Sequence, residues 1–183
     1  NNLITIDGQK MSKSLGNFIT LDEMFSGDHE LLEQVYSPMV VRFFMLQAHY
    51  RSTLDFSNEA LQAAEKGLDR LMKAIALLDS VKPSNESSVN VEKLINRVYE
   101  AINDDMNSPV AIAHIFESVK WINAINDGKQ TITDKDLKEL SDFLKTFVHE
   151  VLGLQEEEQA EGEENSSKLS DVMEILLNFR MEA

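Results

Sequence analysis

The sequence predicts a mostly α-helical protein, an up-and-down bundle of four or five helices preceded by a short strand and a lysine-containing loop. Helix-start signals recur along the chain, and apolar residues follow each of them at helical spacing. These signals are Ser37-Pro38, Ser57, Asn107-Ser108-Pro109 and Thr133. Hydrophobic residues make up 43% of the 183 residues, which is enough to fill the core of such a bundle.

Residues 1–36 form the first predicted unit, the end of a larger region that contains the loop. Residues 3–7, LITID, alternate around β-branched side chains and predict a strand, and Asp7-Gly8 predicts a tight turn. A single strand has no partner in this pattern, so we expect its sheet to lie outside the chain. Residues 18–25 predict one or two helical turns.

Residues 37–154 form the predicted bundle, and its first two helices have clear starts. Ser37 is an N-cap followed by proline at the first helical position, and residues 40–50 form a thick apolar helix. Ser57 caps the second helix. Its apolar residues recur in alternating steps of three and four, which predicts a packing seam. The seam is Leu61, Ala64, Leu68, Leu71, Ile75 and Leu78.

Three further helices complete the predicted bundle after a polar loop at 82–90. The first begins at Val91, the second follows Ser108-Pro109, and the third is capped by Thr133 and stopped by Gly153. We expect the second of these to bury one stripe, composed of Val110, Ala113, Phe116, Val119 and Ile122.

The remaining sequence and the charge limit where such a protein works. Residues 155–167 are acidic and predict a solvated linker, and residues 168–183 regain helical spacing as the truncated start of a further region. The net charge of −15 disfavours loose contact with nucleic acid, so we expect any such contact to be local, through a few basic residues at one edge. The sequence lacks cysteine, a long apolar span and a secretion signal, which predicts a cytoplasmic protein without membrane contact. It also lacks an initiator methionine, so we expect a piece of a longer protein.

The stretch DGQKMSKSLGNF, residues 7–18, has the composition of a flexible loop over phosphates. Lys10 and Lys13 can converge on one polyanion, and Ser12 and Ser14 can donate hydrogen bonds to phosphate oxygens or to the loop itself. Met11 would anchor the loop on an apolar surface. The spacing of a P-loop is absent. On composition alone, a basic surface turn is the alternative.

Letter for letter, KMSKS at residues 10–14 resembles the signature of class I aminoacyl-tRNA synthetases, and residues 7–18 resemble the version in the cysteinyl-tRNA synthetase family. Three further stretches are similar to that family in the same order: VVRFFMLQAHYRSTLDFS at 40–57, NDDMNSPVA at 103–111 and VLGL at 151–154. Residues 26–34 look like an insertion relative to shorter members. Within this resemblance, residues 37–154 correspond to a DALR-type bundle.

The resemblance implies an enzyme that joins cysteine to ATP, with Mg²⁺, and then transfers cysteine to tRNA-Cys. Lys13 is the implied ATP contact and Lys10 a second one, within the motif Lys10, Met11, Ser12, Lys13 and Ser14. The bundle would lie along the tRNA, with Arg42, Arg51 and Arg70 as candidates for phosphate contact. Arg42 could instead pair within the bundle, and Arg51 could hold the loop after its helix. The parent enzyme is expected to be monomeric.

Several parts of the implied active site do not occur in this sequence. The His-Ile-Gly-His signature is absent, and the catalytic zinc implied for the parent needs cysteine ligands, which this chain lacks. The four histidines are scattered, so no metal site is predicted here, and the chain alone is expected to be inactive. Two other functions stay open: another class I synthetase, of the methionyl or arginyl type, or a free-standing helical interaction module in which KMSKS is accidental.

Overall fold

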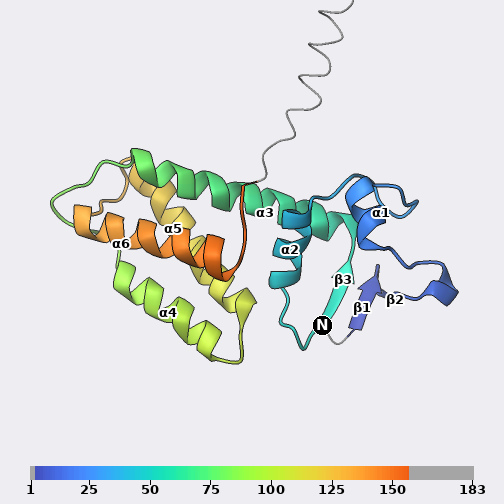
Figure 1. Cartoon of the computed structure of the whole chain (residues 1–183). Helices are drawn as coiled ribbons and strands as arrows, with labels where there is room; N and C mark the ends of the chain where they lie inside the picture. Colours follow the sequence, from blue (N-terminus) through green and yellow to red (C-terminus); the bar gives the residue numbers. More distant parts are fainter. Residues whose placement is uncertain (1–2, 157–183) are drawn as a thin grey trace, which may run out of the picture.

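The computed structural model describes residues 3–156 and confirms a mostly helical fold with a small sheet at one end (Figure 1). The strands are β1 (Leu3–Ile6), β2 (Gln9–Lys10) and β3 (Thr53–Phe56). The α-helices are α1 (Leu21–Ser26), α2 (Pro38–Leu46), α3 (Asn58–Leu77), α4 (Val91–Asn103), α5 (Ser108–Asn126) and α6 (Asp134–Lys145). Shorter helical turns are η1 (Lys13–Leu15), η2 (Leu78–Ser80) and η3 (Thr146–Val151), the last with π-type geometry.

Three predicted N-caps form as expected. The hydroxyl oxygens of Ser37, Ser57 and Thr133 each accept a hydrogen bond from the backbone N–H three residues later. Each of these bonds satisfies one of the amides that a helix start leaves without a helical partner. The sequence therefore places the starts of α2, α3 and α6 correctly.

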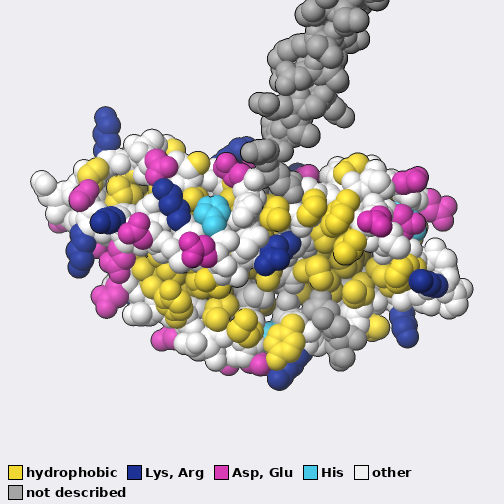
Figure 2. All heavy atoms as spheres, in the orientation of Figure 1, with side chains coloured by type: hydrophobic (Ala, Val, Ile, Leu, Met, Phe, Trp, Pro, Cys, Tyr) yellow, Lys and Arg dark blue, Asp and Glu magenta, His cyan; other side chains and the backbone are white. Residues whose placement is uncertain are grey.

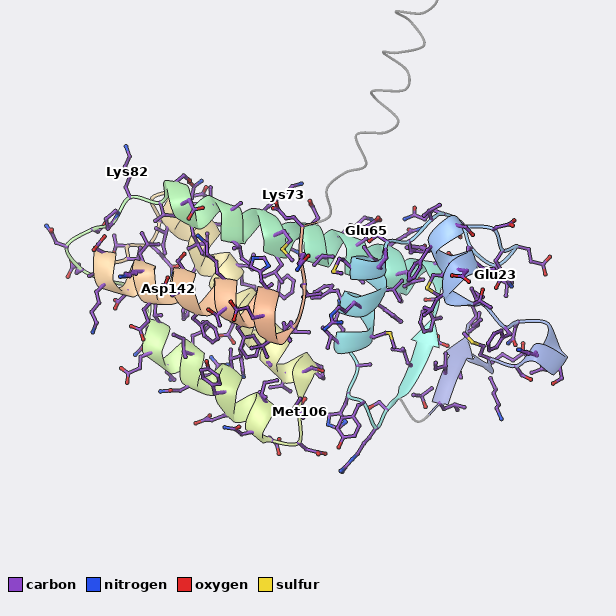
Figure 3. The ribbon with its side chains drawn as sticks, viewed as in Figure 1. Glu23, Glu65, Lys73, Lys82, Met106 and Asp142 are labelled. Atoms are coloured by element: carbon purple, nitrogen blue, oxygen red, sulfur yellow. The ribbon has the colours of Figure 1, made fainter. Side chains whose placement is uncertain are left out.

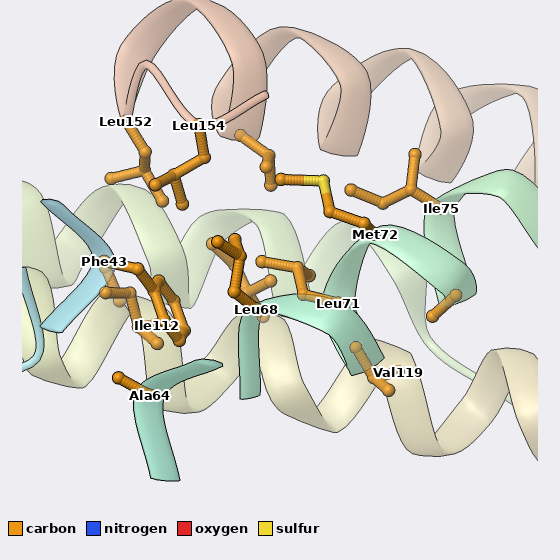
Figure 4. Close-up of a cluster of buried hydrophobic side chains, with 14 of the residues drawn as sticks. Phe43, Ala64, Leu68, Leu71, Met72, Ile75, Ile112, Val119, Leu152 and Leu154 are labelled. Atoms are coloured by element: carbon orange, nitrogen blue, oxygen red, sulfur yellow. The ribbon is translucent and has the colours of Figure 1, made fainter. Parts of the chain in front are cut away.

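The long helix α3 runs the length of the bundle and supplies the centre of the core (Figure 1). All six residues of its predicted seam are buried. They pack against α5, α2 and the chain that follows α6, where Leu152 and Leu154 close the core (Figure 4). Burial of these aliphatic side chains is the main stabilising contribution to the bundle.

Two helix predictions need correction. The predicted helix over 40–50 ends at Leu46, and residues 48–52 form a turn that leads into β3. The buried face of α5 is not the predicted stripe, because Val110 and Ala113 are exposed. The observed face comprises Ala111, Ile112, Ile115, Ser118, Val119, Ile122 and Ile125. Since α5 packs on both α3 and α4 and is apolar on most sides, its spacing alone allows more than one face.

The strand prediction is right for residues 3–6, but its partners lie within the chain. β1 is the central strand of a three-stranded sheet in the order β2-β1-β3. It pairs antiparallel with β2 across the Asp7-Gly8 turn and parallel with β3, with Leu3 opposite Thr53 and Ile6 opposite Phe56. Strand pairing thus joins the predicted unit 1–36 to the predicted bundle 37–154, a division that stays a prediction.

The acidic linker at 155–167 and the segment 168–183 fall almost wholly outside the described residues. Within residues 3–156, no helix is long and apolar enough to cross a membrane.

Candidate phosphate-binding loop

The motif KMSKS lies on a loop that projects from the sheet at one end of the molecule (Figure 1). Asp7 and Gly8 form the preceding turn with φ angles of 49° and 78°. Lys10 lies on β2, and Lys13 begins the short turn η1. Gly16 ends that turn at φ 71°, where glycine is favoured, and its N–H donates to the Lys13 carbonyl oxygen. The chain therefore doubles back immediately after the second lysine.

Asn17 holds the two ends of the motif together, a role that the sequence did not reveal. Its side-chain Oδ1 accepts a hydrogen bond from the Ser12 N–H at 2.8 Å, and its Nδ2 donates to the Lys10 carbonyl oxygen at 3.0 Å. Asn17 is only 8% exposed, although it sits in an exposed loop. This amide fixes the backbone of the loop while leaving the lysine side chains outside.

The side chains of the motif divide into an anchored set and an exposed set. Met11 is half-buried and packs against the core, as predicted, and the Met11 N–H donates to the Ile4 carbonyl oxygen. Ser12 and Ser14 form a hydrogen bond between their hydroxyl groups at 2.8 Å. Lys10 and Lys13 are exposed. The loop therefore presents the ammonium groups of Lys10 and Lys13 to solvent, while contacts of Met11 and Asn17 hold its backbone.

The two lysines differ in their surroundings. Lys13 Nζ lies 5.2 Å from the centre of the Phe18 ring, within range of a cation–π contact. Lys10 has no such ring contact, and in residues 3–156 neither lysine has a carboxylate within ion-pair distance.

A second unpredicted residue, Asp55 on β3, ties the loop to the bundle. One carboxylate oxygen of Asp55 accepts hydrogen bonds from the Thr5 hydroxyl at 2.5 Å and from the Gly8 N–H at 2.8 Å. The Asp7 N–H donates to the Phe56 carbonyl oxygen. β3 leads directly into α3, so the turn that carries the motif is fixed to the start of the longest helix.

The three candidate arginines have different neighbours. Arg42 Nε donates to the Leu152 carbonyl oxygen at 2.7 Å. Arg51 forms an ion pair with Asp105 at 3.1 Å, and its side chain is 69% exposed. Arg70 is exposed on α3 and makes no ion pair within the described residues. For Arg42 and Arg51, these contacts match the structural alternatives that the sequence left open.

Asp105 links the turn before β3 to the corner between α4 and α5. The Tyr50 hydroxyl donates to Asp105 Oδ1 at 2.7 Å, and this hydrogen bond is the main cause that raises the pKa of Tyr50. Asp105 and Met106 both have φ near 55°, an uncommon conformation for residues other than glycine. Figure 3 shows Met106 at this corner, and its side chain is exposed. The corner is held by polar contacts rather than by burial.

Hydrophobic side chains also reach the surface on the face shown in Figure 2, over α1 and α2 and between α4 and α6. Leu21, Phe25, Pro38, Met45 and Tyr50 line a groove of about 450 Å³ beside α2. Most of its lining is apolar, and Arg42 supplies the one charged side chain among the lining residues.

The described residues do not fit a metal centre. Within residues 3–156, no group of three or more His, Asp or Glu side chains could hold a metal ion. The chain has no cysteine, so it cannot supply the thiolate ligands implied for zinc.

Comparison with known proteins decides the family. Residues 1–66 match the family described as "tRNA synthetases class I (C) catalytic domain", and residues 97–156 match the DALR domain. The chain is 51% identical over its whole length to a protein of Parabacteroides distasonis named cysteine–tRNA ligase. Proteins of the same name from Bacteroides fragilis and Porphyromonas gingivalis are 54% and 52% identical, again over the whole chain. The chain belongs to the cysteinyl-tRNA synthetase family.

The chain spans 37% of the length of each of these cysteine–tRNA ligases. The resemblance drawn from KMSKS is therefore confirmed, and so is the prediction of a helical bundle in the chain. The first family match includes the loop, and the second includes the end of the bundle. Asn17 and Asp55, which position the loop, both lie within the catalytic-domain match.

Proposed function

We propose that this chain is the part of a cysteine–tRNA ligase that supplies the ATP-phosphate loop and a tRNA-facing helical bundle. The whole enzyme would join cysteine to ATP, release pyrophosphate, and transfer the cysteinyl group to the 3′ end of tRNA-Cys. The proposal rests on identity of about half of all positions to three ligases of that name, together with the exposed lysines of the loop.

Lys13 and Lys10 are the proposed ATP contacts. Negative charge builds on the leaving pyrophosphate during activation, and an ammonium group fixed nearby stabilises that charge most in the transition state. Asn17 holds the backbone of the motif at Lys10 and Ser12, which favours a defined approach of both lysines. Ser12 and Ser14 would exchange their mutual hydrogen bond for phosphate oxygens.

For tRNA, the proposed contacts are Arg42, Arg51 and Arg70. All three arginines are exposed, and guanidinium groups bind phosphate with paired N–H donors. Arg51 would keep one side on Asp105 while its other N–H groups face the RNA. With a net charge of −15, the acidic remainder of the chain would repel RNA elsewhere and confine it to these positions.

Other requirements would be met outside the described residues. Mg²⁺ would arrive with ATP and neutralise its phosphates, and the zinc that selects the cysteine thiolate would be held by the part of the enzyme that this chain does not cover. The proposed setting is the cytoplasm, and the proposed parent is a monomer.

The decisive experiment is amino-acid-dependent ATP–pyrophosphate exchange by the full-length protein, tested with each amino acid in turn. We expect exchange with cysteine alone and a loss of about a hundredfold or more in Lys13→Ala. Lys82→Ala is the matched control, because Lys82 lies at the opposite end of the bundle from the loop (Figure 3). The 183-residue chain by itself should show no exchange.

The other outcomes separate the alternatives. Exchange with methionine or arginine would move the chain to a sister synthetase. No exchange with any amino acid would favour a helical interaction module. A Lys13→Ala variant as active as Lys82→Ala would remove the loop from the proposed mechanism.

A further inference from the structure

The contact between Lys13 and Phe18 carries an inference that rests on the proposed function and deepens it. We propose that Phe18 is a positioning residue that holds the Lys13 ammonium group while no phosphate is bound and releases it to ATP. The ring centre lies 5.2 Å from Lys13 Nζ. Phe18 is 38% exposed, so the ring is open to solvent and to the lysine above it.

The backbone makes this contact local to the motif. Gly16 turns the chain at φ 71°, and Asn17 fixes the backbone at Lys10 and Ser12. The chain between Lys13 and Phe18 therefore has little freedom of its own. The ring meets the second lysine of the motif, whereas Lys10, on β2, has no aromatic partner within residues 3–156.

An aromatic ring suits this task better than a carboxylate would. The chain carries 32 Asp and Glu against 17 Lys and Arg, so carboxylates are the commonest partners it could offer an ammonium group, yet none lies within ion-pair distance of Lys13 in residues 3–156. If a carboxylate bound Lys13, phosphate would have to displace it by breaking an ion pair between two full charges. The face of a phenyl ring attracts the cation through its quadrupole but carries no charge.

The contact is weak enough to be released. An exposed cation–π pair corresponds to about a two- to fivefold preference for the held state. A triphosphate offers full negative charges and hydrogen-bond acceptors to the same group, so it displaces the ring. The held state should therefore lower the apparent affinity for ATP by about three- to sixfold, because only the released fraction is competent to bind.

The first test is spectroscopic and needs no catalysis. In the free 183-residue chain, ring current from Phe18 should shift the Lys13 side-chain methylene protons upfield in the NMR spectrum, assigned by their loss in Lys13→Gln. Phe18→Leu should abolish the shift, and Phe18→Tyr, which retains a ring, should keep it. An unshifted Lys13 in the unaltered chain would overturn the proposal.

The second test is kinetic and uses the full-length protein. Phe18→Leu should lower the KM for ATP in pyrophosphate exchange by about three- to sixfold, with the effect in KM rather than kcat, and Phe18→Tyr should restore the original KM. A merely structural role predicts the opposite sign, a raised KM. An unchanged or raised KM in Phe18→Leu would overturn the inference.

The two proposals fail in different ways. If exchange is absent, or survives Lys13→Ala, the proposed function fails while the ring-current shift can still be present. If exchange depends on Lys13 but Phe18→Leu leaves KM unchanged, the function stands and the holding role of Phe18 is wrong.

Discussion

Arg42 Nε donates a hydrogen bond to the carbonyl oxygen of Leu152, joining α2 to the end of the bundle 110 residues later in the sequence. The last helical carbonyls have no partner within their own helix, so a guanidinium donor there satisfies one of them. His149 Nδ1 lies 2.7 Å from the Leu154 carbonyl oxygen in the same turn. The C-terminal end of the bundle is thus stabilised by polar side-chain contacts as well as by its apolar core.

Gly153→Ala should destabilise the chain by about 1–3 kcal/mol, measured by urea denaturation. Gly153 has φ 64°, which an alanine adopts with strain, and an added Cβ would lie 2.6 Å from Arg42 Nη2. Gly128→Ala is the matched control, because Gly128 has φ 71° but nothing within 4 Å of the added Cβ. The control should show the backbone part of the effect alone, about 1 kcal/mol.

A double variant separates the two contributions. In an Arg42→Ala background, Gly153→Ala should lose its steric part and fall to the level of Gly128→Ala. Equal effects of Gly153→Ala in both backgrounds would show that the guanidinium does not crowd this position.

Arg42→Met should destabilise the chain by about 1–2 kcal/mol, because it removes a charged donor from the Leu152 carbonyl while keeping much of the side-chain stem. The measurement is the urea midpoint at constant slope. Arg70→Met, an exposed arginine on α3 without an ion pair in the described residues, should change the midpoint little. Equal midpoints for both variants would contradict a capping role for Arg42.

Asp55→Ala should release the turn that carries the loop. The buried Thr5 hydroxyl and the Gly8 N–H both lose their acceptor, at a cost of about 1–3 kcal/mol. Hydrogen exchange should quicken at the amides of residues 5–11 before the rest of the chain opens. Asp127→Ala, which breaks only a surface pair with Lys129, is the control, and equal exchange in both variants would argue against the tie.

The pair between Arg97 and Glu117 should make stability depend on acid pH. Two hydrogen bonds of 2.8 Å from Arg97, with a smaller contribution from His114, lower the pKa of Glu117 below its ordinary value of 4.5. A carboxyl group with a lowered pKa in the folded state stabilises it above the ordinary value. That contribution is lost as pH falls through the folded pKa. Glu117→Gln should therefore be less stable at pH 7, and the difference should shrink below about pH 4.5.

The control for this prediction is Glu139→Gln, an exposed residue of α6 without an ion pair in residues 3–156. This variant should change the stability little at pH 7, because it removes no ion pair within the described residues. A constant difference for Glu117→Gln between pH 7 and pH 3 would show that the carboxylate charge is not what Arg97 stabilises.

Local signals explain what the sequence could predict. Ser37, Ser57 and Thr133 act within three residues of themselves, so the helix starts could be read directly. The seam of α3 follows one regular stripe, so the spacing identified its centre, although Met72 and Ala74 beside it are buried as well. The motif at 10–14 is a contiguous string of residues, so it is recognisable from the sequence without any geometry.

The parts that the sequence missed depend on distant partners. Asp55 ties the loop from about 50 positions away, and nothing in STLDFS distinguishes a strand from a polar helix start. Asn17 acts locally, but the burial of a single amide in an exposed loop produces no periodic pattern in the sequence. The face of α5 was assigned wrongly because two neighbouring helices compete for an apolar surface that is wider than one stripe.

The parallel pairing of β1 with β3 has a consequence for synthesis on the ribosome. Thr5 and Asp55, which face each other in this pair, are 50 positions apart. At about 5–20 residues per second, β1 would emerge several seconds before its parallel partner exists. During that interval its free edge is open to other chains, and only the short hairpin with β2 covers one side. Rapid docking of α2 and α3, which delivers β3, would therefore protect the nascent protein from aggregation.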